Sequence, residues 1–241
     1  MANRRVFGLP GRAPRQSRTR SWPVPTGLLL LSLVPVLAGV FRVIQLLGGP
    51  ELIPADQRFA GFPLPLVVHL LGATLYVVVG AFQFVPRLRR NHPGWHRRVG
   101  RVLAVAGLLV AGSALWMTLF YAEKPGTGAL LYVLRLVFAS AMTICLVLGV
   151  TTIRNGDVAG HRAWMIRAYA IGIAAGMQAI TGGIGEALFG TGALQGDLAK
   201  ASAWVINLAV AEWVIRRQAG SRSSTRRNGK ALRVARVGAP S

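Results

Sequence analysis

Residues 63–86 read PLPLVVHLLGATLYVVVGAFQFVP and contain no Asp, Glu, Lys or Arg. An α-helix needs about 20 mostly apolar residues to cross the ~30 Å hydrocarbon core of a bilayer. Five further segments of the chain are comparably apolar, so the predicted spans are residues 26–47, 63–86, 99–121, 128–152, 164–187 and 201–215. The sequence therefore predicts an all-α polytopic membrane protein, a bundle of six transmembrane helices.

The composition agrees with this fold class. The chain has 241 residues, of which 53% are hydrophobic and 15% are charged, and its mean hydropathy is +0.48. Soluble domains carry about a quarter charged residues, so the charged fraction here is low. The single cysteine, Cys145, falls within the fourth predicted span and excludes an intramolecular disulfide and a cysteine-based metal site.

The net charge of +21 and pI near 12.0 are typical of nucleic-acid-binding proteins, but the distribution of charge indicates a membrane topology instead. With a cytoplasmic N-terminus, the inner side holds six arginines before residue 21, six at 87–101, three at 154–167 and eight Lys or Arg from Arg216 to Arg236. The outer side holds Arg58, Lys124 and Lys200. The positive-inside rule therefore predicts a bacterial inner-membrane protein with both termini in the cytoplasm.

The same basic segments predict the partners. Lys and Arg beside a membrane attract anionic lipid headgroups, so we expect the lipid bilayer and those headgroups as partners, with an unidentified membrane protein as a further candidate and no nucleic acid. Residues 1–25 and 218–241 are rich in Arg, Ser, Pro and Gly without apolar periodicity. We predict that they are disordered basic cytoplasmic tails flanking one transmembrane domain at 26–217.

Polar residues inside the spans predict an intramembrane polar site. One stripe of the second span, about 100° wide, carries His69, Tyr76 and Gln83 among small residues, which is typical of either a helix–helix seam or the wall of a cavity. Arg135 lies about two turns below the outer surface, at the depth of His69, and needs a partner there. Glu186 is the best acidic candidate by depth. The predicted site comprises His69, Tyr76, Gln83, Arg135, Gln178, Glu186 and Asn207.

Two matched basic corners are predicted at the inner face. Arg89 precedes His96 by seven residues and Arg154 precedes His161 by seven, which suggests an internal repeat of two hairpins, although two matched positions could also be coincidence. The corner residues are His96, Arg97, Arg101, His161, Arg162, Trp164, Arg167 and Glu212. Arg167 and Glu212 lie at equal depth and are expected to form an ion pair. The small residues Ala168, Gly172 and Gly176, four apart, predict a close helix contact.

Five short motifs resemble an uncharacterised bacterial membrane family, domain of unknown function 2306. They are HLLGA at 69–73, FQFVP at 82–86, HRRVGR at 96–101, HRAWMIR at 161–167 and N-x-x-x-x-E-W at 207–213, within a resemblance over residues 60–216. The resemblance implies a multi-pass membrane protein and no stated activity. It implies these signature positions: His69, Gln83, His96, Arg97, Gly100, Arg101, His161, Arg162, Trp164, Met165, Arg167, Asn207 and Glu212. The resemblance also implies an arginine in the later part of the fifth span, where this chain has Gln178.

The residues favour a non-catalytic accessory, assembly or small-solute-handling protein over an enzyme. No His-Glu-x-x-His metalloprotease pattern occurs, and the inner face offers only Asp157 and Glu212 as metal-binding carboxylates, so we predict neither a resident metal nor a cofactor. The alternative is a membrane redox protein that binds haem b through His96 and His161, which lie at matching depth, with neighbouring arginines pairing the propionates. A membrane enzyme without a cofactor is the third possibility.

Overall fold

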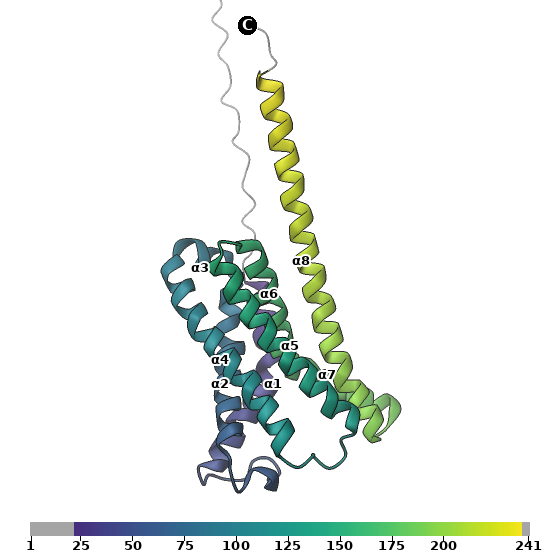
Figure 1. The fold of residues 1–241 in the computed structure, drawn as a ribbon. Coiled ribbons are helices and arrows are strands. Elements are labelled where there is room, and N and C mark those ends of the chain that lie inside the picture. Colours follow the sequence, from purple (N-terminus) through teal and green to yellow (C-terminus); the bar gives the residue numbers. More distant parts are fainter. Residues whose placement is uncertain (1–21, 238–241) are drawn as a thin grey trace, which may run out of the picture.

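A computed structural model of the protein describes the backbone of residues 22–237 and the side chains of residues 22–220. Within that part the regular structure is entirely helical (Figure 1). Its elements are α1 (Pro23–Leu46), the short 3₁₀ helix η1 (Gln57–Phe59), α2 (Leu64–Gln83), α3 (Pro86–Asn91), α4 (Pro93–Phe120), α5 (Ala129–Arg154), α6 (Val158–Gly172), α7 (Ala174–Phe189) and α8 (Ala193–Val237). The all-α prediction is confirmed.

Five helices are long and apolar enough to cross a membrane singly: α1, α2, α4, α5 and the Ala193–Gly220 part of α8. The helices α6 and α7 pass the same test together, with a bend of 44° between them at Ile173. The protein is therefore a polytopic helical membrane protein with up to six spans. The span predicted at 164–187 is present as this bent pair, and the break within it was not predicted; Gly172 ends α6 there and weakens helical continuity.

The helix ends differ from the predicted domain boundaries. α1 begins at Pro23, whose ring suits the first turn of a helix. α8 continues to Val237, so the backbone of residues 218–237 is helical where we predicted disorder. That stretch contains no proline and several good helix formers, including Arg, Lys, Ala and Leu, and it prolongs a helix that already exists. The other predicted tail residues, 1–21 and 238–241, lie outside the described residues.

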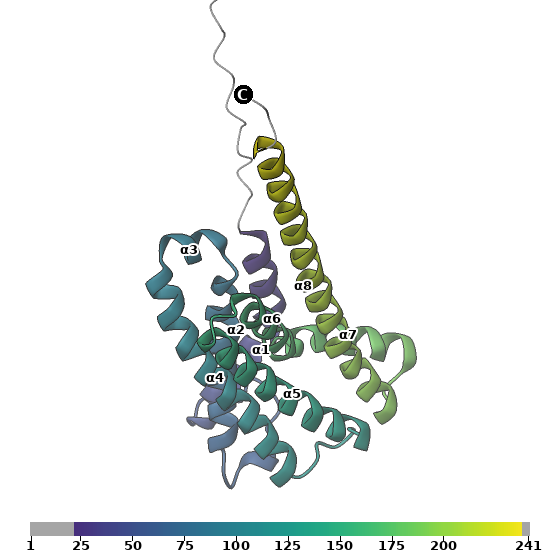
Figure 2. The same cartoon turned by 45° about the horizontal axis from the view of Figure 1, so that its top comes forward.

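The bundle has two distinct ends (Figures 1 and 2). We call one the α3 end; it carries α3, the turn between α5 and α6, the start of α1 and the emerging part of α8. The opposite end, which we call the η1 end, carries η1, the loop at 121–128 and the turn between α7 and α8. The first and last described helices thus begin and finish on the same side, as an even number of spans requires.

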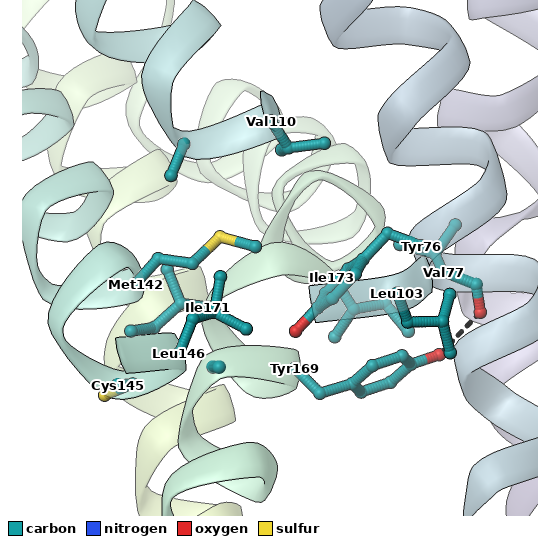
Figure 3. Close-up of a cluster of buried hydrophobic side chains, with 12 residues drawn as sticks. Tyr76, Val77, Leu103, Val110, Met142, Cys145, Leu146, Tyr169, Ile171 and Ile173 are labelled. Atoms are coloured by element: carbon teal, nitrogen blue, oxygen red, sulfur yellow. Dashed lines mark hydrogen bonds between the residues drawn. The ribbon is translucent and has the colours of Figure 1, made fainter. Parts of the chain in front are cut away.

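The core lies where α2, α4, α5 and α6 meet (Figure 3). The Tyr169 hydroxyl donates a hydrogen bond to the Val77 carbonyl (2.7 Å), and both residues are buried. The Tyr76 ring packs so closely on Gly107 of α4 and Gly172 of α6 that a Cβ at either glycine would lie 2.8 Å from it. The polar stripe of the second span is thus a helix seam at this level.

Candidate functional site

A cavity of about 560 Å³ lies at the η1 end, bounded by α1, α2, α4, α5, α7, α8 and the adjoining loops. We call it the η1 cavity. Most of its wall is apolar, and includes Leu66, Leu70 and Met142 as well as Phe138 and Trp204, whose rings stack with centroids 4.6 Å apart. Its volume falls in the range of cavities that hold small-molecule ligands.

Three basic residues that line the cavity lie within about two turns of the start of their helices. His69, Arg135 and Lys200 are the sixth, seventh and eighth residues of α2, α5 and α8, and each of these helices starts at the η1 end. At 1.5 Å per residue they lie roughly 8–11 Å below their helix ends. The prediction placed Arg135 and His69 at similar distances from the outer surface, which agrees with this arrangement. Lys200 was predicted to lie on the outer side, just before the last span, whereas the structure places it within α8.

Arg135 and Lys200 are half-buried cations without a direct partner. Neither the guanidinium of Arg135 nor the ammonium of Lys200 forms an ion pair or hydrogen bond with any residue in the described part of the chain. Asp197 acts on both electrostatically, and Glu123 also acts on Arg135. The predicted pairing of Arg135 with Glu186 is wrong: Glu186 is exposed on α7, beyond the 44° bend that a straight fifth span did not include.

Asp197 is engaged elsewhere, at the start of α5. It is 1% exposed, and its carboxylate accepts hydrogen bonds from the backbone N–H groups of Gly128 and Leu131, each at 3.0 Å. A carboxylate there satisfies donors that a helix leaves unpaired and faces the positive end of the helix dipole. No pattern in the sequence indicates this role, because Gly128 lies 69 residues away in the chain.

Two other cations that line the cavity, Arg42 and Arg58, do have partners. Arg42 donates hydrogen bonds to the Gln45 side chain (2.6 Å) and to the Pro54 carbonyl (2.8 Å). Arg58 forms an ion pair with Asp56 at 2.6 Å, and its guanidinium holds the pKa of that carboxyl below its ordinary value. Of the four cations named here that line this cavity, Arg135 and Lys200 are therefore the two without a direct partner in the described part of the chain.

His69 is fixed by α4 and lies at the junction of two cavities. Its Nδ1 is 3.1 Å from the Val110 carbonyl oxygen and 3.1 Å from Ser113 Oγ. Besides the η1 cavity it lines a smaller one of about 110 Å³, enclosed by α1, α2 and the residues around the α6–α7 break. For His69, the structure favours the cavity wall over the plain helix seam.

The other members of the predicted polar site are distributed over three places. Gln178 lines the η1 cavity, and its amide is 3.5 Å from the Lys200 carbonyl. Tyr76 belongs to the core. Asn207 is buried and donates to the Ala170 carbonyl (3.1 Å) just before the break, and Gln83 near the α3 end has amide atoms that are buried without a partner in the described chain. Counting depth along the predicted helices therefore grouped residues that contact different neighbours in the structure.

The predicted ion pair near the α3 end is confirmed. Arg167 Nε and Nη2 donate to the two carboxylate oxygens of Glu212, at 2.5 and 3.1 Å. The guanidinium also lies over the Trp164 ring, 4.8 Å from its centroid. This bidentate, stacked arrangement joins α6 to α8 and leaves Arg167 little freedom to bind a ligand.

The two predicted corners occupy equivalent helix positions. His96 and His161 are each the fourth residue of their helix, α4 and α6. His161 Nδ1 lies 2.7 Å from the Gly149 carbonyl, whereas His96 Nδ1 is buried without a partner among the described residues. Arg97 donates to Pro93 in its own turn, Arg101 is exposed, and Arg162 is half-buried. No three His, Cys, Asp or Glu side chains of the described residues come together as a metal site.

The comparisons with known proteins agree with the motifs. The model of the family described as predicted membrane protein (DUF2306) matches residues 66–215, which is more than half of the chain and runs from the first turn of α2 to Ile215 in α8. No curated protein and no solved structure matches the chain. The extent of the family match confirms the resemblance seen in the sequence: the chain belongs to the DUF2306 family of predicted membrane proteins.

Proposed function

We propose that the protein is a non-catalytic, solute-handling membrane protein that binds a small amphiphilic anion in the η1 cavity. The observation that carries this proposal is the pair Arg135 and Lys200, two cations that share one largely apolar cavity and lack a direct partner in the described chain. Holding an unpaired charge at membrane depth is costly. A bound carboxylate or phosphate would reduce that cost.

The cavity wall supports the amphiphilic part of the proposal. Around the two cations it presents Leu66, Leu70, Met142 and the stacked rings of Phe138 and Trp204. Apolar surface of this kind favours an alkyl chain over a small hydrated anion, because burial of the chain removes apolar area from water. An alkyl carboxylate or alkyl phosphate therefore complements both components of the wall.

We also propose that the protein lies in the bacterial inner membrane with the α3 end in the cytoplasm. The arginines at 87–101 and 154–167 gather at the α3 end, and α8 leaves the bundle there with its basic extension. These charges support the positive-inside orientation and an attraction to anionic lipid headgroups. In this orientation the η1 cavity opens toward the outer side.

Replacing the two unpaired cations tests the proposed function. We expect the purified protein in a non-ionic detergent to bind decanoate and dodecyl phosphate, and Arg135→Gln and Lys200→Gln each to weaken that binding by about tenfold to a hundredfold, since a charge-assisted hydrogen bond contributes about 1.5–3 kcal/mol. Isothermal titration calorimetry measures the affinities. Arg154→Gln, at the exposed last residue of α5 and at the other end of the bundle, is the matched control and should bind normally. Equal binding by all variants would contradict the proposal.

Haem binding through His96 and His161 is the second candidate. Two observations favour it: the buried, unpartnered Nδ1 of His96, and the Nδ1 hydrogen bond of His161 to a carbonyl, which leaves Nε2 for a metal as in many ligating histidines. A Soret band in the protein expressed with added haem, abolished by His96→Ala or His161→Ala, would support this candidate. A colourless protein would eliminate it.

A further inference from the structure

The hydrogen bonds of His69 determine which ring nitrogen carries a proton. Nδ1 lies 3.1 Å from the Val110 carbonyl, and a carbonyl oxygen only accepts. The nearby Ser113 hydroxyl has one proton, which it donates within its own helix, where the Leu109 carbonyl is 2.6 Å and the Val110 carbonyl 3.0 Å from Oγ, so its oxygen is an acceptor toward the ring. Nδ1 therefore carries the proton, and the neutral imidazole presents Nε2 as a bare acceptor.

That acceptor has no partner from the protein. Nε2 of His69 makes no hydrogen bond with the residues that the structure describes, while its side chain lines both the η1 cavity and the smaller cavity beside it. The ring is locked to α4 through Nδ1, so the position of Nε2 is fixed before any ligand arrives. An acceptor held in this way at a cavity wall favours a ligand that brings a donor.

The residues around His69 indicate which group of a ligand would donate to Nε2. The two unpaired cations that line the same cavity, Arg135 and Lys200, bring donors only and are suited to the anionic group of the ligand. His69 adds the one acceptor of this basic trio. An ordinary alkyl carboxylate or dianionic alkyl phosphate satisfies the two cations and leaves Nε2 unpaired.

We infer that the ligand of the η1 cavity is a hydroxyl-bearing amphiphilic anion, whose hydroxyl donates to Nε2 of His69 while its anionic group lies at Arg135 and Lys200. This inference rests on the proposed function and narrows its ligand class. The hydroxyl belongs either to a hydroxy fatty acid or to the glycerol of a single-chain lysophospholipid, and both carry the same chemistry. His69 is thus the specificity-determining residue of the site.

Two matched pairs of probes test this inference and distinguish a hydroxy fatty acid from a lysophospholipid as the ligand. One pair is decanoate and 3-hydroxydecanoate; the other is dodecyl phosphate and lauroyl lysophosphatidic acid. We expect the hydroxyl-bearing member of at least one pair to bind wild-type protein about fivefold more tightly, because a net hydrogen bond contributes about 0.5–1.5 kcal/mol. The pair that shows the preference identifies the source. Titration calorimetry gives both affinities.

Variants of His69 assign the preference to this ring. His69→Met removes the nitrogen acceptor and should abolish the preference for the hydroxyl-bearing probe, while the parent anion still binds. His69→Gln keeps an acceptor and should retain part of that preference. Thr143→Val, which removes a hydroxyl that bonds only within α5, is the control and should keep the full preference. If neither pair shows a preference in the wild-type protein, the inference is overturned, whatever the stability of the variants. If none of the probes binds at all, the proposed function itself fails.

Discussion

At the scale of single residues, one proline and one glycine bring two helices into backbone contact. Pro35 lies inside α1 and has no N–H, so the Leu31 carbonyl loses its helical donor. That carbonyl lies against Gly176 of α7, where an added Cβ would come within 2.1 Å of the oxygen. Close backbone approach at glycine is a common way for membrane helices to gain packing contacts.

Gly176→Ala should therefore separate α1 from α7. We expect a loss of roughly 1–3 kcal/mol in the free energy of unfolding, the usual cost of forcing an extra methyl group into a packed site. Gly182→Ala is the matched control, because Gly182 lies on the same helix with no atom within 4 Å of an added Cβ. Unfolding by titration with a denaturing detergent measures both. Equal stability of the two variants would contradict the contact.

Single residues also show how far counting depth along a helix can predict contacts. Arg167 and Glu212 were correctly paired in this way, since neither lies beyond the break. The ladder of Ala168, Gly172 and Gly176 correctly predicted close packing, but not that Tyr76 and Leu31 are its partners. Arg135 and Glu186 were wrongly paired, because depth contains no information about direction around the helix.

At the scale of elements, the break between α6 and α7 is stabilised from α8. A helix that ends inside the membrane leaves carbonyl groups without intrahelical donors. Asn207 of α8 is buried and donates its side-chain amide to the Ala170 carbonyl, two residues before the end of α6. The last span thus supplies a donor that the broken span lacks.

Asn207→Leu tests this stabilisation of the break. The substitution keeps the approximate volume but leaves the Ala170 carbonyl buried and unpaired, so we expect a loss of about 1–3 kcal/mol in the free energy of unfolding. Ser202→Ala on the same helix is the control, since the Ser202 hydroxyl bonds within α8 to Ala199. A null effect of Asn207→Leu in the same detergent titration would argue against the role of this hydrogen bond.

The break could not be predicted from hydropathy. The segment around Ile173 is apolar on both sides and contains no proline, and a hydropathy window treats it as one span. Its signal is the density of glycine and alanine from Ala168 to Gly176, which indicates close packing and bending equally well. The other spans lack such a break and were predicted to within a few residues, except that α4 begins earlier and α8 runs beyond its predicted span at both ends.

At the scale of the whole molecule, the charge distribution predicts an orientation that the fold alone does not give. Both described termini lie at the α3 end, which fixes their relation to one another but not which side of the membrane they occupy. The basic loops at that end favour the cytoplasm. The composition and spacing of the spans were therefore sufficient for the architecture, and the side-chain charges add the orientation as a prediction.

Single cysteines introduced into the two groups of loops test this orientation. The native Cys145 is buried, and Cys145→Ser removes any background. In spheroplasts, we expect a membrane-impermeant maleimide to label Lys124→Cys, in the loop between α4 and α5, and to label Asn155→Cys only after permeabilisation. Both native residues are exposed, so access to the reagent depends on the side of the membrane. The reverse labelling pattern would overturn the orientation.

The carboxylate of Asp197 also has a consequence for biogenesis. A chain emerges from the ribosome with its N-terminal part first. When α5 enters the bilayer, the N–H groups of Gly128 and Leu131 have no carboxylate to bind, because Asp197 is synthesised 66 residues after Leu131. The start of the fourth span therefore gains these hydrogen bonds only after the last span has been synthesised. A chain truncated before α8 would lack them, and we expect membrane quality-control proteases to degrade it.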